Sequence, residues 1–104
     1  MNIDQPWTSE TVQSFISSIV AEVVRTSGTE PPSLSASTAP VDDVEGFDSL
    51  ASLEAVVLMQ EHLGVELPDD LFFSKTGKKT RARSIEEVAG VVLAYISQKG
   101  KVYA

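Results

Sequence analysis

Residues 46–70 read GFDSLASLEAVVLMQEHLGVELPDD, and this stretch decides how the rest of the chain is interpreted. Apolar residues recur between Ser49 and Leu63 with the three- and four-residue spacing of a helix. Gly64 follows at once, and glycine is the residue type that most often ends a helix. We therefore predict a helix from Ser49 to about Leu63 that begins with a serine.

Helices are also predicted on both sides of this segment. Helical spacing continues from Thr8 to Val24, and either Thr8 or Ser9 can cap the first turn. Residues 84–87 form a capping box, which opens a last helix that we expect to end near Gly100. The residues expected to be buried by these two helices are Val12, Phe15, Ile16, Ile19, Val20, Val23, Val24, Ile85, Val88, Ala89, Val92, Leu93 and Ile96.

Two connections complete the predicted fold. Residues 25–47 are rich in proline, glycine and serine, so we predict a long loop there. Pro68 and the two acids after it suit the first turn of a short third helix that buries Leu71, Phe72 and Phe73. The prediction is an all-α four-helix bundle with a long first loop, a short third helix and no strands. The loop residues expected to reach the core are Leu34, Val41, Val44 and Phe47.

Length and composition limit the class of protein. The chain has 104 residues and a formal net charge of −7, which fits one domain over residues 1–104 with its core at about 8–98. An acidic balance argues against nucleic acid as the main partner. There is no cysteine and only one histidine, so we expect no disulfide, no cysteine chemistry and no metal site. The apolar runs are too short to span a bilayer and no signal peptide is visible, so we expect a cytoplasmic monomer.

Positive charge is concentrated in one short segment. Residues 75–83 hold five of the eight bases and no acid, whereas residues 1–74 hold 13 acids and one base. Like charges repel and the segment has no large apolar residue to bury, so we predict a mobile loop insertion. The alternative is a contact for an acidic partner or an anionic acceptor.

Ser49 has a simple structural interpretation. A serine that follows a loop and opens a helix is the typical N-cap, where its hydroxyl accepts a backbone N–H. A nucleophilic serine would need a base within hydrogen-bond reach. The only histidine, His62, lies 13 residues later, which is about 20 Å along the same helix. We therefore expect no catalytic residue, and we assign His62 to the helix C-terminus, where it favours the dipole.

The same serine carries a resemblance to a known family. Asp48-Ser49-Leu50 at a helix start is followed by Glu54, by residues 63–69 (LGVELPD) and by a last helix through Tyr95-Ile96. In this order and spacing the chain resembles the acyl carrier proteins from Thr8 to about Gln98. The resemblance implies that a phosphopantetheinyl transferase attaches 4′-phosphopantetheine from coenzyme A to Ser49. The thiol of that arm would carry acyl groups as thioesters, which agrees with a chain that has no cysteine.

Asp48, directly before Ser49, has two interpretations. Asp48 resembles the family's acid before the serine, which implies a role in transferase recognition. It can equally be a loop acid or an auxiliary cap, and both can hold. Leu50 completes the attachment motif. The implied function is delivery of acyl intermediates to enzymes of fatty-acid, lipid or polyketide-type synthesis.

The predicted helix at 49–63 is apolar over a wide arc. With about 100° per residue, one set of residues faces the bundle, and Leu58 fits neither set. A second set lies on the side of Ser49, beside acids, and the resemblance implies that acyltransferases and ketosynthase-type enzymes dock there through basic patches. The alternative is that the whole arc is buried. The bundle set is Ser52, Ala55, Val56, Met59 and Leu63, and the docking set is Leu50, Leu53, Glu54, Val57 and Glu61.

The chain also departs from the family. Ala51, Gln60 and His62 stand in a helix where the commoner fatty-acid carriers have more acids, so the docking face is less acidic. Asp48 favours acyl cargo, because peptidyl carriers more often have histidine before the serine. An aminoacyl or peptidyl carrier and a non-carrier adaptor bundle remain alternative functions.

Overall fold

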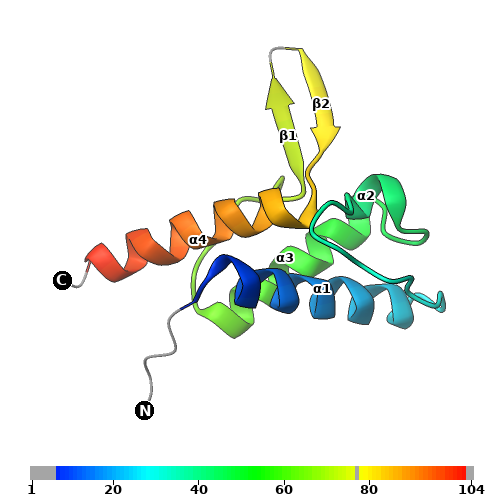
Figure 1. Cartoon of the computed structure of the whole chain (residues 1–104), viewed down its shortest axis with the longest axis horizontal. Helices are drawn as coiled ribbons and strands as arrows, with labels where there is room; N and C mark the ends of the chain where they lie inside the picture. The colour runs from blue at the N-terminus through cyan, green and yellow to red at the C-terminus, as the bar shows by residue number, and fades with distance from the viewer. Residues whose placement is uncertain (1–6, 77, 103–104) are drawn as a thin grey trace.

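The computed structural model describes residues 7–76 and 78–102. Three long helices pack together, and a two-stranded hairpin projects away from them (Figure 1). The predicted helical bundle with a long first connection is confirmed. In chain order the elements are α1 (Ser9–Thr26), α2 (Pro40–Asp43), α3 (Ser49–Leu63), β1 (Phe73–Thr76), β2 (Lys79–Ala82) and α4 (Ile85–Val102).

Local capping fixes where the long helices begin. Thr8 caps α1, with its hydroxyl accepting the Thr11 N–H and the Thr11 hydroxyl accepting the Thr8 N–H. The predicted capping box of α4 is confirmed, since Ser84 and Glu87 exchange hydrogen bonds of 2.9 and 3.2 Å. α4 ends at Val102, two residues beyond the Gly100 that was expected to mark its end. A glycine inside a helix lowers helix stability by only about 1 kcal/mol relative to alanine, so a helix can continue through it.

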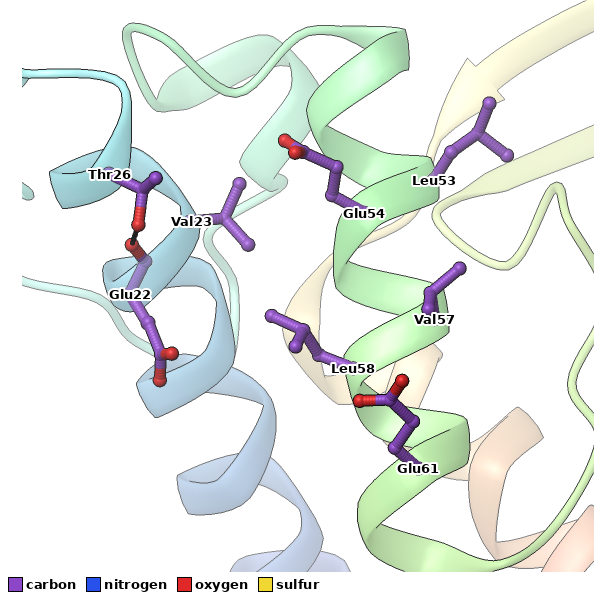
Figure 2. Close-up of a pocket in the computed structure, with 8 residues that line it drawn as sticks. All are labelled: Glu22, Val23, Thr26, Leu53, Glu54, Val57, Leu58 and Glu61. Carbon is purple, nitrogen blue, oxygen red and sulfur yellow. Dashed lines mark hydrogen bonds between the residues drawn. The ribbon is translucent and has the colours of Figure 1, made fainter.

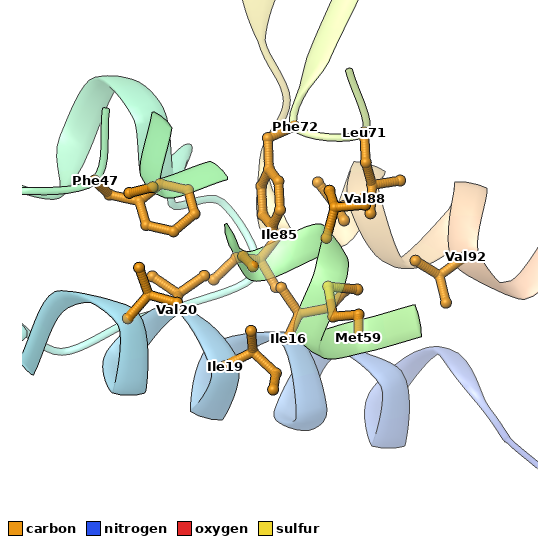
Figure 3. Packing of buried hydrophobic residues seen from close by; sticks show 14 of the residues in the cluster. Ile16, Ile19, Val20, Phe47, Met59, Leu71, Phe72, Ile85, Val88 and Val92 are labelled. Carbon is orange, nitrogen blue, oxygen red and sulfur yellow. The ribbon is translucent and has the colours of Figure 1, made fainter. Parts of the chain in front are cut away.

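The core lies where α1, α3 and α4 meet (Figure 3). α1 packs against both other long helices. The rings of Phe47 and Phe72 meet edge to face with centroids 5.1 Å apart, which brings the end of the first connection to the start of the hairpin. Of the residues predicted to be buried, Phe15, Leu34, Val41, Leu93 and Ile96 are partly buried and pack against this cluster, and Phe73 is also only half-buried.

The short helix lies elsewhere than predicted. Residues 69–72 form consecutive turns, with the Leu71 N–H on the Pro68 carbonyl and the Phe73 N–H on the Asp70 carbonyl. These hydrogen bonds between residues three apart do not continue as a helix, because Phe73 already begins a strand. The short helix is instead α2, inside the connection predicted to be all loop, where Pro40 occupies its first turn.

The basic segment is a β-hairpin, so the predictions of a loop there and of no strands are wrong. β1 and β2 pair antiparallel. The register explains how so many bases fit: each one in a strand is paired with a hydroxyl residue, so no two cations stand directly opposite. The pairs are Lys75 with Thr80, Thr76 with Lys79, and Ser74 with Arg81. Within the described ranges, no helix combines the length and the apolar character needed to cross a membrane.

Candidate functional site

Asp48, and not Ser49, caps α3. The Asp48 backbone is extended, and its carboxylate oxygen Oδ1 accepts the Ala51 N–H at 2.9 Å. Ser49 is therefore the first residue inside the helix. The interpretation of Ser49 as the N-cap is wrong, and the alternative role of Asp48 as a cap is confirmed. Because the aspartate takes over capping, the serine hydroxyl is left without a structural task.

The Ser49 side chain is exposed. Among the described residues, nothing hydrogen-bonds to its hydroxyl, and only its carbonyl is engaged, by the buried Ser52 hydroxyl at 2.7 Å. His62 lies near the other end of α3, where its ring contacts Phe15 with centroids 5.8 Å apart. Ser49 is thus an accessible hydroxyl to which no base among the described residues is hydrogen-bonded.

The start of α3 offers a favourable place for an anion. Within residues 7–76 and 78–102, the backbone N–H groups of Ser49 and Leu50 have no hydrogen-bond partner. α3 has 15 residues, and its aligned peptide dipoles leave partial positive charge at this end. A phosphate bonded to the Ser49 oxygen would lie within the reach of that charge, so these residues fit a phosphate-linked group.

Three large apolar side chains on α3 face solvent. Leu50 is 71% exposed, Leu53 41% and Val57 50%. The residues assigned to the bundle side are buried, apart from Leu63, which is half-buried. The alternative in which the whole arc is buried is therefore wrong. Leu58 is half-buried and packs against the core.

An acid-rimmed groove runs between α1 and α3 (Figure 2). Its volume is about 480 Å³, and its lining includes Leu53, Val57 and Leu58. Glu54 and Glu61 come from α3, as the sequence suggested, whereas Leu50 lies outside the groove lining. The lining residues from α1 are Glu22, Val23 and Thr26.

Glu22 is the functional candidate that sequence reasoning missed. It lies on the exposed side of α1, about one turn from its end, with no motif to mark it. Only the packing of α1 on α3 brings this carboxylate to the groove that holds Glu54 and Glu61. The groove therefore carries three acids and no base around an apolar floor. That combination suits a partner surface with both basic and apolar residues.

Comparison with known proteins gives one positive finding. The family model for the phosphopantetheine attachment site matches residues 14–77, which is more than half of the chain. The matched range includes Asp48, Ser49 and Leu50. No curated protein and no solved structure matched the chain.

Proposed function

This chain belongs to the phosphopantetheine attachment family, and from that membership we propose that Ser49 receives the prosthetic arm and that the cargo is an acyl group. The protein is a carrier that binds covalently attached 4′-phosphopantetheine, and it is not an enzyme. The arm supplies a terminal thiol on which cargo is held as a thioester. A phosphopantetheinyl transferase and synthase-type partner enzymes are the proteins with which such a carrier acts.

The observation that carries the assignment of Ser49 is its free, exposed hydroxyl at the start of α3. Asp48 supplies the helix cap, so the hydroxyl can be esterified without loss of a structural hydrogen bond. The unpaired N–H groups of Ser49 and Leu50 support a bound phosphate. No base in the described part of the chain is hydrogen-bonded to Ser49, so we propose that the transferase removes its proton.

The exposed side of α3 supports the second part of the proposal. We propose that enzymes of fatty-acid, lipid or polyketide-type synthesis dock on Leu50, Leu53, Glu54, Val57 and Glu61, with Glu22 of α1 added. An exposed apolar patch rimmed by charge is typical of an interaction surface. A basic enzyme surface would be attracted to these acids and oriented by them.

Intact-mass measurement tests the attachment. The protein is incubated with coenzyme A and a phosphopantetheinyl transferase, and we expect a gain of one phosphopantetheinyl group. Ser49→Ala should abolish the gain, whereas Ser33→Ala, which removes another exposed serine, should not. Loading that persists in Ser49→Ala would contradict the assignment, and an unchanged wild-type mass with several transferases would favour the adaptor alternative.

Cargo is tested on the loaded protein. Transferases that accept acyl-coenzyme A substrates should charge the arm, and adenylating enzymes that activate amino acids should not. Charging with an amino acid alone would replace the acyl assignment by a peptidyl carrier.

A further inference from the structure

The β1–β2 hairpin carries charge that the carrier function does not use. Lys75, Lys78, Lys79 and Arg81 lie on it, with no acid among residues 73–82. All four are exposed. Arg81 is paired with Glu87, whereas the three lysines form no ion pair with any described residue. The hairpin is therefore a strongly positive projection from a chain whose net charge is −7.

The hairpin is fixed at its base. The Arg83 N–H donates to the Phe72 carbonyl at 2.8 Å and closes the two strands, and the Arg83 guanidinium donates to the Leu71 carbonyl at 3.1 Å. The Arg81 guanidinium donates hydrogen bonds to both carboxylate oxygens of Glu87, at 3.0 and 2.7 Å. That contact lowers the pKa of Glu87 to about 2, so the pair stays charged across the physiological range. Because Glu87 also caps α4, the direction of the hairpin is tied to that helix.

The hairpin also stands at the Ser49 end of the bundle. Phe72, which directly precedes β1, contacts Phe47, which lies two residues before Ser49. β2 lies against α2, which belongs to the same connection (Figure 1). An enzyme that reaches the arm at Ser49 therefore comes close to the hairpin as well as to the groove.

We propose that the β1–β2 hairpin is a second docking element, opposite in sign to the groove, that selects partner enzymes with an acidic patch beside the entrance for the arm. This inference rests on the proposed carrier function. The groove offers Glu22, Glu54 and Glu61 to a basic patch, and the hairpin offers three lysines to an acidic one. A partner with both patches is attracted in one orientation only. An enzyme with a uniformly basic entrance is attracted by the groove and repelled by the hairpin.

A protein partner fits the hairpin better than a membrane. The described hairpin residues beyond Phe73 are polar or charged up to Arg81, so nothing there can insert among lipid chains. Lysines near an anionic membrane contribute about 1 kcal/mol each, and the acidic body opposes them. A membrane needs no second patch of opposite sign, whereas a folded enzyme surface can present both.

Acyl-transfer kinetics test the inference. The triple variant Lys75→Gln, Lys78→Gln, Lys79→Gln removes the free charges and keeps Arg81 with its partner. Lys99→Gln, at a base of α4 outside the hairpin, is the control. Both variants are first loaded at Ser49 and checked by intact mass. They are then offered to acyltransferases and ketosynthases of the source organism, grouped by whether acids flank the entrance for the arm.

We expect the triple variant to load as the wild type does. With enzymes whose entrance is flanked by acids, its kcat/KM should fall about 10-fold at low ionic strength, and the deficit should shrink as salt screens the charges. The triple variant should keep the wild-type kcat, and Lys99→Gln should keep both the wild-type kcat and kcat/KM. With enzymes whose entrance is flanked by bases, the kcat/KM of the triple variant should equal or exceed that of the wild type.

The results that overturn the inference are separate from those that overturn the carrier function. Failure to load at Ser49, or a loaded protein that donates to no enzyme, refutes the proposed function. Normal loading and transfer with no effect of the triple variant refutes the hairpin alone. An equal fall in the kcat/KM of the triple variant with both groups of enzymes also refutes the hairpin proposal. So does wild-type binding to phosphatidylserine–phosphatidylcholine vesicles that the triple variant loses, because a lipid surface is then the partner.

Discussion

Val56 and Val57 are neighbours on α3 with opposite environments, and truncating each one measures where the core ends. Val56 is 2% exposed and Val57 is 50% exposed. We predict that Val56→Ala lowers the free energy of unfolding by about 1–2 kcal/mol. For Val57→Ala we predict a change below about 0.5 kcal/mol.

These magnitudes follow from burial and helix propensity. Each buried methyl group contributes about 0.8 kcal/mol, so a fully buried valine loses about 1.6 kcal/mol on truncation, plus a cavity term. A half-exposed valine loses about 0.8 kcal/mol and leaves no cavity. Alanine returns roughly 0.5 kcal/mol at both positions, because it favours the helix more than valine does. The helix term cancels between the two variants, so their difference reports burial.

Urea titration followed by far-UV circular dichroism gives both free energies of unfolding. Acyl transfer to a partner enzyme supplies the second readout, at a temperature where both variants are folded. There Val57→Ala should lower kcat/KM, because the side chain lines the groove, and Val56→Ala should not. A loss of stability for Val57→Ala as large as for Val56→Ala would place Val57 in the core and refute the groove as a docking surface.

Three other outcomes are expected. Glu22→Lys and Glu54→Lys should each slow acyl transfer in a salt-dependent way and leave the helical circular dichroism unchanged. If only Glu54→Lys slows transfer, α1 is not part of the docking surface. Asp48→Ala should lower the free energy of unfolding by about 1 kcal/mol through loss of the cap, and Asp48→Asn, which can also cap, should keep the wild-type value. If intact mass shows that Asp48→Asn is loaded poorly, the transferase recognises the negative charge of Asp48. The Arg81 hydrogen bond lowers the pKa of Glu87 from 4.5 to about 2, so the stability gained from this carboxylate is complete above its unfolded pKa and is lost as pH falls towards 2. Between pH 4.5 and 2, the urea midpoint should change less with pH for Glu87→Gln than for the wild type. An equal change with pH in both proteins would show that the Glu87 carboxylate does not contribute this stability.

The sequence by itself determined the features that depend on near neighbours in the chain. The helical spacing of α1, α3 and α4 follows from side chains three and four residues apart, and the capping box at Ser84 is a local exchange of hydrogen bonds. The angular position of Val57 placed it on the Ser49 side of the helix, and the family resemblance, more than the pattern, favoured the exposure that the structure shows. Attachment at Ser49 stays a prediction from its motif.

Only the tertiary structure decided the features that depend on distant parts of the chain. Residues 73–82 have no apolar alternation to signal strands, and the hairpin is anchored by Glu87 of α4 and by the Phe47–Phe72 contact. Turns replace a third helix at 69–72 because the following residues pair as strands. Glu22 joins the groove only because α1 packs on α3. The Phe47–Phe72 contact and the packing of α1 on α3 join residues far apart in the chain, so local spacing cannot predict them; the free energy that stabilises them comes from packing in the folded chain.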